Sequence, residues 1–248
     1  MCNVEQKINK IKTEVENYFG TKLPKKKILT VTPRPIASFI DHTILQPTTT
    51  KKDVLRICKE AKEHQFKAVC IPPRFVSVAQ KNLWETNIDI ATVIGFPLGY
   101  NKSSIKRQET AKAVDSGATE IDMVLPLGAL TDKNWKVVRK DIQFVVDGAS
   151  GVPVKVILET GLLSAEQIIA GCFIALMSRA QFVKTSTGFG PRGASIEDIK
   201  IMHACVGDQM GIKASGGIKD YTTAMQMIEA GATRIGTSSG VAIVASQS

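Results

Sequence analysis

From residue 36 onward, short runs of apolar and β-branched residues alternate with longer segments of helical spacing. Short apolar runs are typical of buried strands, and strands that alternate with helices indicate parallel βαβ units. The runs fall at residues 37–42, 67–71, 90–95, 119–124, 153–159, 180–184, 210–214 and 233–236. Eight strand–helix units in about 210 residues predict a (β/α)8 TIM barrel of the α/β class.

A doubly wound open sheet is the alternative α/β architecture for this pattern. That fold usually carries a Gly-x-Gly-x-x-Gly turn after its first strand, and no such turn follows residues 37–42. A length of 248 residues is also typical of one barrel. We therefore expect a single catalytic barrel domain over residues 36–248.

The first 35 residues do not follow the repeat. Apolar residues recur there at intervals of three and four, at Val4, Ile8, Ile11, Val15 and Tyr18. This spacing predicts an extra N-terminal helix. Residues 21–35 hold three consecutive lysines and three prolines, a composition typical of a linker. We expect residues 1–35 to form a helix and a basic linker, with the helix packed on the barrel.

More than half of the net charge of +9 lies in this arm, where seven Lys and one Arg accompany three Glu. A basic arm can bind nucleic acid or an acidic membrane surface. No aromatic residues interleave Lys25-Lys26-Lys27 and no binding motif follows them, so we expect a solvated arm and no nucleic-acid partner. A basic protein also attracts anionic substrates such as sugar phosphates.

The apolar segments, the cysteines and the histidines of the chain indicate where the protein is located and whether it binds a metal. The chain has no run of about 18 apolar residues and no signal-like N-terminus, so neither a membrane span nor secretion is expected. Five cysteines without a Cys-x-x-Cys pair favour reduced thiols in a cytoplasmic protein. The histidines, His42, His64 and His203, show no metal-ligand spacing, so we expect no catalytic metal.

Three ionisable residues lie at or near the ends of predicted strands. Lys184 closes residues 180–184, Lys213 closes the run 210–213, and Asp122 lies within residues 119–124. Alternate residues of a barrel strand face inward, and charged residues at the carboxyl ends of these strands are typically catalytic. A single lysine at a strand end is more often a solvated cap, but three such residues on the fourth, sixth and seventh strands indicate one shared pocket.

Two lysines and one aspartate in a pocket indicate amine chemistry on a carbonyl compound. A lysine amine attacks only when it is uncharged. A positive Lys213 beside Lys184 would favour the uncharged form of Lys184, because two neighbouring ammonium groups repel each other. We expect Lys184 to attack, Lys213 to tune it and Asp122 to move protons.

Glycine-rich segments follow the seventh and eighth predicted strands, at residues 215–218 and 236–240. Glycine lets backbone amides approach an anion, and many barrels bind phosphate after these two strands. Ser238 or Ser239 is expected to cap the last helix and to donate a hydroxyl. The glycine-rich segment 185–195 is expected to fold over the ligand. Cys70, at the end of the second run, is expected to be a small wall residue of the pocket.

The ordered strings that carry these residues lie at 40–43, 93–99, 117–124, 155–160, 182–190, 213–218 and 234–240. Over residues 36–245 the sequence resembles the deoxyribose-phosphate aldolase family, which are class I aldolases with the barrel fold. The resemblance implies reversible cleavage of 2-deoxy-D-ribose 5-phosphate to acetaldehyde and D-glyceraldehyde 3-phosphate, without a cofactor. It also implies a homodimer.

The resemblance assigns roles to individual residues. It places the Schiff-base lysine at Lys184, the second lysine at Lys213 and the proton-relay aspartate at Asp122. Phosphate contacts fall on Gly188, Gly216, Gly217, Gly236, Ser238 and Ser239, and contacts to the sugar end fall on Thr43 and Cys70. The chain departs from many members at Gln46, where they have Lys, and it lacks a tyrosine near its C-terminus.

The residues alone leave two other functions open. Barrels with similar phosphate-binding segments include phosphosugar isomerases, epimerases and synthases, which generally need no Schiff base. A non-catalytic protein that binds anions through the basic arm is the second alternative.

Overall fold

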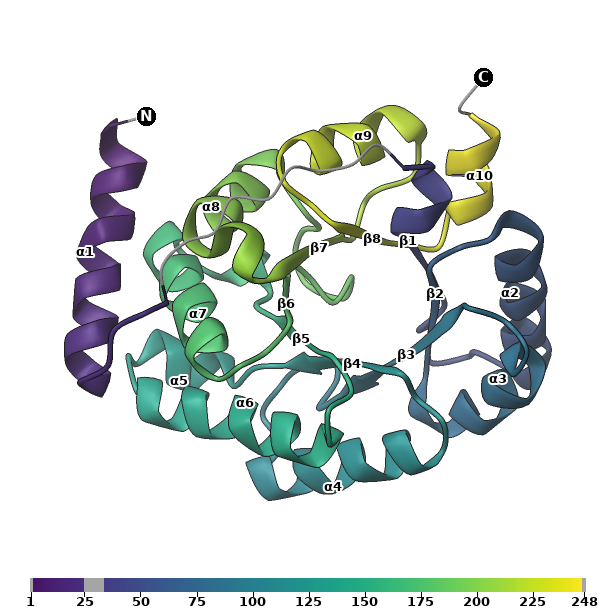
Figure 1. The fold of residues 1–248 in the computed structure, drawn as a ribbon, viewed down its shortest axis with the longest axis horizontal. Helices are drawn as coiled ribbons and strands as arrows, with labels where there is room; N and C mark the ends of the chain where they lie inside the picture. Colours follow the sequence, from purple (N-terminus) through teal and green to yellow (C-terminus); the bar gives the residue numbers. More distant parts are fainter. Residues whose placement is uncertain (1, 25–33, 247–248) are drawn as a thin grey trace.

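The structure is a computed structural model that describes residues 2–24 and 34–246, and its centre is a closed parallel barrel (Figure 1). The strands are β1 (Ile40–Thr43), β2 (Ala68–Ile71), β3 (Asp89–Ile94), β4 (Glu120–Val124), β5 (Val154–Ile157), β6 (Phe182–Lys184), β7 (Gly211–Ser215) and β8 (Arg234–Thr237). Each strand pairs in parallel with the next in the chain, and β8 pairs with β1. The predicted (β/α)8 TIM barrel is confirmed.

Helices surround the barrel on all sides (Figure 1). They are α2 (Lys51–His64), α3 (Val76–Leu83), α4 (Ser103–Asp115), α5 (Leu127–Thr131), α6 (Trp135–Ala149), α7 (Ala165–Met177), α8 (Ile196–Val206), α9 (Tyr221–Glu229) and α10 (Gly240–Ala245). Several begin at side-chain caps that satisfy free backbone amides. Ser195, for example, accepts a hydrogen bond from the Asp198 amide at the start of α8.

The first strand is shorter than predicted. Residues 37–39 belong to a 3-10 helix, η1 (Ile36–Phe39), and β1 begins at Ile40. The amide and the hydroxyl of Ser38 both donate to the Pro35 carbonyl, at 3.0 and 2.7 Å, which holds this segment in a turn. The seventh strand ends later than predicted. β7 continues to Ser215, so Lys213 lies inside the strand and not at its end.

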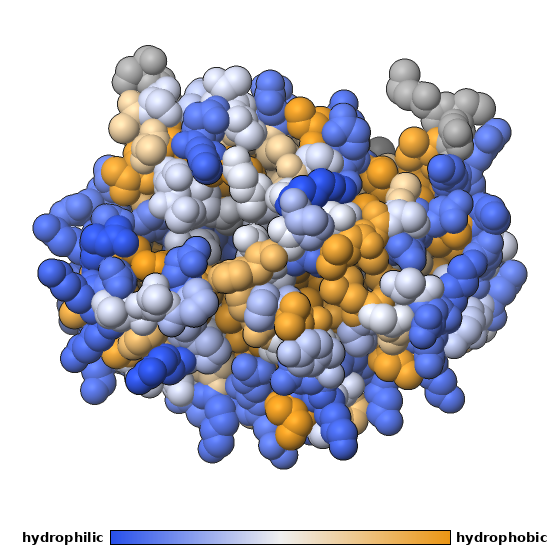
Figure 2. All heavy atoms as spheres, turned by 180° about the vertical axis from the view of Figure 1, so that it is seen from behind, coloured by the Kyte–Doolittle hydropathy of each residue, from blue (hydrophilic) through white to orange (hydrophobic). Residues whose placement is uncertain are grey.

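Alternation along the strands separates an apolar shell from the barrel interior. In β4, Ile121 and Met123 belong to the main core that packs against the helices. Glu120 and Asp122, at the intervening positions, are buried charged residues. Parallel strands in such barrels are covered on both faces, which explains why they appear as short apolar runs in the sequence. In the view of Figure 2, polar residues dominate the edge of the molecule, while apolar residues gather toward the middle.

The predicted N-terminal helix is present as α1 (Cys2–Phe19), which packs along α7 and α8 outside the barrel (Figure 1). Ile8, Ile11 and Val15 form its buried stripe, and Gly20 ends it with φ of +61°. The lysines at residues 25–27 lie outside the described residues. None of the described helices has the length and apolarity needed to cross a membrane.

Candidate active site

Among the described residues, seven charged side chains occupy the interior of the barrel, and we call them the charge cluster. Its members are Asp41, Glu120, Asp122, Lys155, Lys184, Lys213 and Arg234, and all are at least 96% buried. They come from β1, β4, β5, β6, β7 and β8. Burial of this many charges is tolerated only where each is paired with an opposite charge.

The carboxylate of Asp122 joins three lysines at the centre of the charge cluster. Its Oδ2 accepts hydrogen bonds from Lys184 Nζ and Lys213 Nζ, each at 2.8 Å. Its Oδ1 accepts one from Lys155 Nζ at 2.8 Å. The strand register accounts for this arrangement, because Asp122 aligns with Lys155 and Lys184 aligns with Lys213. The structure thus brings together the three residues expected to react.

A second set of pairs lies around Asp41 and Glu120. Lys213 Nζ lies 2.5 Å from Asp41 Oδ2, and Arg234 donates to Asp41 Oδ1 at 2.6 Å. Arg234 also makes two hydrogen bonds to Glu120, at 2.7 and 3.1 Å. Lys155 donates to Glu120 at 2.7 Å. Lys213 and Lys155 therefore each contact more than one carboxylate, whereas Asp122 is the one carboxylate of the described residues that pairs with Lys184.

These pairs set the protonation states of the buried groups. Burial alone would raise the pKa of Asp122, but Lys155, Lys184 and Lys213 outweigh burial and hold that pKa well below its usual value. Burial alone would lower the pKa of Lys213, but Asp122 and Asp41 raise it above its usual value. The pKa of Lys155 is raised in the same way, chiefly by Asp122 and Glu120. Asp122 is therefore ionised, and Lys155 and Lys213 are charged at neutral pH.

The charge cluster carries an excess of positive charge when every member is ionised. Four cations then accompany three carboxylates. Loss of one proton would balance the buried charges, and an unbalanced buried charge is costly. Lys184 is the lysine of the charge cluster with a single carboxylate partner among the described residues. It lies beside two charged lysines and is the least tightly paired amine of the charge cluster.

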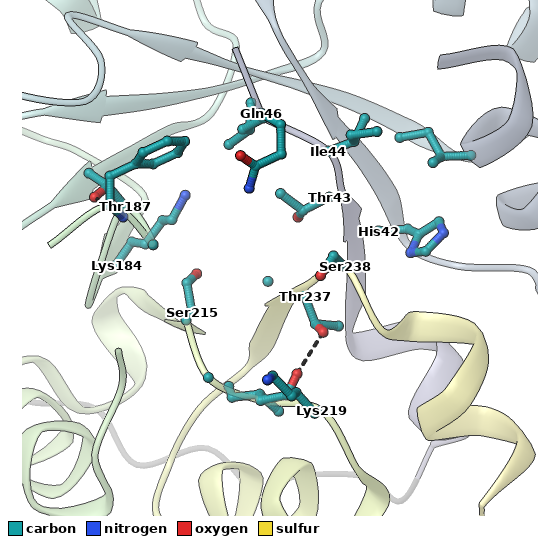
Figure 3. A pocket seen from close by; sticks show the side chains of 18 of the residues that line it. His42, Thr43, Ile44, Gln46, Lys184, Thr187, Ser215, Lys219, Thr237 and Ser238 are labelled. Atoms are coloured by element: carbon teal, nitrogen blue, oxygen red, sulfur yellow. Dashed lines mark hydrogen bonds between the residues drawn. The ribbon is translucent and has the colours of Figure 1, made fainter. Parts of the chain in front are cut away.

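A cavity of about 380 Å³ opens above Lys184 at the carboxyl ends of the strands (Figure 3). Lys184 lines it, whereas the other members of the charge cluster do not. Six of the predicted substrate-binding residues line it too, namely Thr43, Gly188, Gly216, Gly217, Gly236 and Ser238. In Figure 3, Lys184 faces Thr43 and Gln46 across the cavity, with Ser215 and Ser238 nearby. The cavity joins the amine to the glycine-rich segments.

Two loops meet closely at the cavity wall. Gly216 and Gly217 have φ of +86° and +80°, a conformation that other residues rarely adopt. A Cβ on Gly193 would lie 2.1 Å from the Gly216 carbonyl oxygen, so glycine is required where segment 185–195 crosses this turn. The Ala194 amide donates to the Ser215 carbonyl at 3.0 Å and fixes the crossing. Such turns are suited to present backbone amides to an anion.

Comparison with known proteins agrees with this geometry. The family model for DeoC/LacD family aldolases matches residues 36–246, which include every strand of the barrel and the whole charge cluster. The chain belongs to the DeoC/LacD family of aldolases.

Individual relatives of this aldolase are similar over most of their length. A deoxyribose-phosphate aldolase of Clostridium tetani is 50% identical over 210 residues, which cover 84% of this chain and 97% of the relative. One of Halalkalibacterium halodurans is 50% identical over 213 residues, 85% of this chain and 95% of the relative. A solved deoxyribose phosphate aldolase of Aeropyrum pernix, described as tetrameric, is 32% identical with a TM-score of 0.80, and the match covers 85% of this chain and 90% of that one.

Two residues predicted to contact substrate in this aldolase lie outside the cavity lining. Cys70 is fully buried and packs with Ala91 and Val93 inside the barrel. Burial raises the pKa of its thiol, which keeps it protonated and a weak nucleophile. Ser239 is not a lining residue, and its amide donates to Thr237 Oγ1 at 2.9 Å.

The expected serine cap of α10 does not form. Ser239 occupies the cap position, but its side chain accepts no capping hydrogen bond. Its backbone has φ of −103° and ψ of 25°, whereas a capping residue is usually extended.

Sequence reasoning missed several residues of the site. Asp41, Lys155 and Arg234 were assigned no role, although each is a charged residue within an apolar strand, the signal that identified Asp122. Arg56 and Lys219 line the cavity and add positive charge to it. Their positions on α2 and after β7 carry no pattern that distinguishes them from solvated surface residues.

His42 lies away from Lys184 in Figure 3. Its Nε2 is 2.6 Å from Glu60 on α2, and the ring is almost fully buried. Burial lowers the pKa of His42, although Glu60 opposes this effect. No three His, Cys, Asp or Glu side chains are arranged to hold a metal ion in the described part of the chain.

Proposed function

We propose that this aldolase reversibly cleaves 2-deoxy-D-ribose 5-phosphate to acetaldehyde and D-glyceraldehyde 3-phosphate through a Schiff base on Lys184. The main support is the position of its amine. Lys184 is the only lysine of the charge cluster that lines the cavity. Lys155 and Lys213 lie beneath it, fully buried between carboxylates. A carbonyl compound that enters the cavity therefore meets the Lys184 amine first.

The proposed reaction begins with the uncharged Lys184 amine. Nζ attacks the aldehyde carbon C1 of the open-chain sugar, and loss of water gives an iminium ion. Loss of the proton from the C3 hydroxyl breaks the C2–C3 bond, and the electron pair moves to the iminium nitrogen. D-glyceraldehyde 3-phosphate leaves, and an enamine of acetaldehyde remains. Protonation at C2 and hydrolysis release acetaldehyde and restore the amine.

Asp122 and Lys213 support these steps from beneath. The Asp122 carboxylate contacts both lysine nitrogens, so it can accept a proton from Lys184 and pass protons to water in the cavity. The charged Lys213 favours the uncharged form of Lys184 by repulsion. The phosphate would bind at the turns of Gly188, Gly216 and Gly217 and at Gly236 and Ser238. Arg56 and Lys219 add positive charge there.

The proposal extends to the organisation of the protein. Residues 36–248 form the catalytic unit, and residues 1–35 are an appendage that binds no nucleic acid. The sugar end contacts Thr43, and the enzyme needs no metal or organic cofactor. A cytoplasmic homodimer is the expected form. Light scattering of the purified protein would test the dimer against the tetramer described for the Aeropyrum pernix relative.

Borohydride reduction in the presence of acetaldehyde tests the central step. The treatment should add one two-carbon unit to the protein, and peptide mapping should place it on Lys184. Lys184→Ala should abolish the adduct and nearly all turnover and still fold. Lys200→Ala, at an exposed lysine of α8, is the matched control and should retain both.

Other results would point to other functions. An adduct on Lys213 or Lys155 would refute the assignment of the nucleophile. Conversion of a phosphosugar without any adduct would favour an isomerase, epimerase or synthase. Absence of turnover together with salt-dependent anion binding, lost on removal of residues 1–35, would favour the non-catalytic alternative.

A further inference from the structure

Glu159 is a buried acid that the proposed reaction does not use. It follows β5, and only 3% of its surface is exposed. Its backbone has φ of 55° and ψ of 60°, the left-handed region that glutamate rarely adopts. Strained backbone of this kind persists where the surrounding structure requires it, often near a functional site. No lysine, arginine or histidine of the described chain forms a salt bridge with Glu159, unlike the carboxylates of the charge cluster.

The carboxylate of Glu159 binds the turn that follows Lys184. Its Oε2 accepts hydrogen bonds from the Thr187 amide, at 3.1 Å, and from the Thr187 hydroxyl. The same hydroxyl oxygen accepts the Phe189 amide at 3.0 Å. A continuous chain of hydrogen bonds thus runs from Glu159 through Thr187 to Phe189. Thr187, Gly188 and Phe189 all line the cavity.

These contacts decide which amide of the turn is free. The amides of Thr187 and Phe189 are both used within this chain of bonds. The amide of Gly188, between them, meets no acceptor among the described residues. Gly188 has φ of +90°, and a Cβ there would meet no atom within 4 Å, so this residue borders open space. The free donor of the turn is therefore available to a ligand in the cavity.

The other oxygen of Glu159 shows how tightly the acid is enclosed. Oε1 is buried and has no hydrogen-bond partner among the described residues. A Cβ at Gly190 would lie 2.7 Å from it, so a larger residue there would displace the carboxylate. A buried carboxylate oxygen without a partner is costly, and a negative charge near a phosphate site repels the ligand. The position of Glu159 is understandable if its effect on the turn outweighs both costs.

We propose that Glu159 is a positioning residue that, through Thr187, holds residues 187–189 so that the Gly188 amide binds the phosphate group of the substrate. This inference rests on the proposed function, because it assigns the phosphate to this end of the cavity. Glu159 does not contact the reacting atoms. By holding the turn of residues 187–189 in shape, it increases the preference of the enzyme for deoxyribose 5-phosphate over deoxyribose.

Four variants test the hydrogen-bond chain. Glu159→Ala and Thr187→Val break it at two points, whereas Thr187→Ser keeps the hydroxyl and should preserve function. Glu166→Gln, at an exposed acid of α7, is the control. The main readout is the ratio of kcat/KM for deoxyribose 5-phosphate to kcat/KM for deoxyribose. That ratio should fall about tenfold in Glu159→Ala and in Thr187→Val, the loss typical of one hydrogen bond to a charged group.

Two further measurements separate positioning from other roles. The double variant should lose no more than either single variant, because both changes break the same chain. The affinity of each protein for inorganic phosphate, measured by calorimetry, should fall in parallel with the ratio. If Glu159→Ala fails to fold, the comparison of Thr187→Val with Thr187→Ser decides the question.

Contrary results are distinct from failure of the proposed function. Tighter phosphate binding in Glu159→Ala would show that its charge matters and its positioning does not. Equal losses for both substrates, or additive losses in the double variant, would also overturn the inference. Failure of the proposed function itself would appear in the unchanged protein, as absence of the Lys184 adduct. Calorimetry with inorganic phosphate tests the role of Glu159 even then.

Discussion

Replacement of Lys213 by methionine removes one buried positive charge and keeps most of the side-chain volume. Lys213 is fully buried, with Nζ 2.8 Å from Asp122 and 2.5 Å from Asp41. Without it, three cations remain for three carboxylates. The buried charges are then balanced with every lysine protonated, so an uncharged amine is harder to obtain. We expect Lys213→Met to fold less stably and to form the Schiff base slowly at neutral pH.

General values for buried charges set the expected size of both effects. Removal of one partner from a buried ion pair typically costs about 3–5 kcal/mol. At roughly 2–4 °C per kcal/mol for a chain of this size, the melting temperature should fall by about 6–20 °C. An opposite charge at about 4–6 Å shifts a titration by about 1–3 pH units, and a like charge acts in the other direction. Removal of Lys213 should therefore move the midpoint of borohydride trapping to higher pH by a shift of about that order.

The contribution of Lys213 to the free energy of unfolding depends on pH in a way that its pKa predicts. The carboxylates raise the pKa of Lys213 above that of a lysine in the unfolded chain, about 10.4. Its stabilising effect is therefore complete below about pH 10.4 and is lost only as the pH rises through the folded value. The contribution of Lys213 itself to the stability difference should therefore be constant between pH 6 and 9.

The assay is the rate of borohydride trapping with acetaldehyde from pH 6 to 10, together with thermal unfolding. Lys200→Met is the matched control. Lys213→Met combined with Asp41→Asn should recover part of the lost stability, because the Asp41 oxygen that loses Lys213 then no longer carries a charge. The same trapping midpoint in Lys213→Met and in the unchanged protein would refute the reasoning. Lys213 would then bind substrate or relay protons instead.

Three further predictions follow from the site. Ser238→Ala removes a donor to the phosphate, so KM for deoxyribose 5-phosphate should rise roughly ten- to a hundredfold; an equal rise for deoxyribose would place the phosphate elsewhere. Burial lowers the pKa of His42 below the unfolded value of about 6.5. The unfolded chain then binds more protons, so stability should increase with pH up to about 6.5, by at most about 1.4 kcal/mol per unit. The free energy of unfolding, measured by chemical denaturation from pH 5 to 7, should increase less with pH in His42→Asn than in the unchanged protein. An equal increase in both proteins would exclude His42 as the source of this pH dependence. EDTA should leave turnover unchanged, since the iminium replaces a metal as the electron acceptor; loss of activity that zinc restores would contradict this.

Strand periodicity was sufficient to predict the barrel and the meeting of its three central residues. Asp122 and Lys184 fall on inward positions of their strands, and closure of the sheet brings inward charges together. The same alternation of inward and outward residues would have placed Lys155 beside Asp122. The two residues are aligned in the pairing of β4 with β5. The pairing of Arg234 with both Asp41 and Glu120 depends on side-chain reach across the interior, which no sequence spacing encodes.

The errors arose where local backbone geometry competed with an apolar pattern. Residues 37–39 are apolar enough for a strand, but the Pro35 carbonyl holds Ser38 in a turn. Ser239 has a residue type favoured at caps, but its backbone is not extended. Glu159 belonged to a recognised string and was given no role. Its importance depends on a left-handed backbone and on contacts with a turn 28 residues later.

The pairing of β1 with β8 has a consequence for how the protein is made. Asp41 and Arg234 are separated by 193 residues, and β8 leaves the ribosome after the other strands of the barrel. Until then, Asp41 and Glu120 lack their arginine and remain better hydrated in an open chain than in a closed interior. Contacts between such distant segments form late and slow the folding of a chain. The surroundings of Lys184 are therefore completed only after β8 has been synthesised, and a shorter chain would lack the closed interior in which its amine is held.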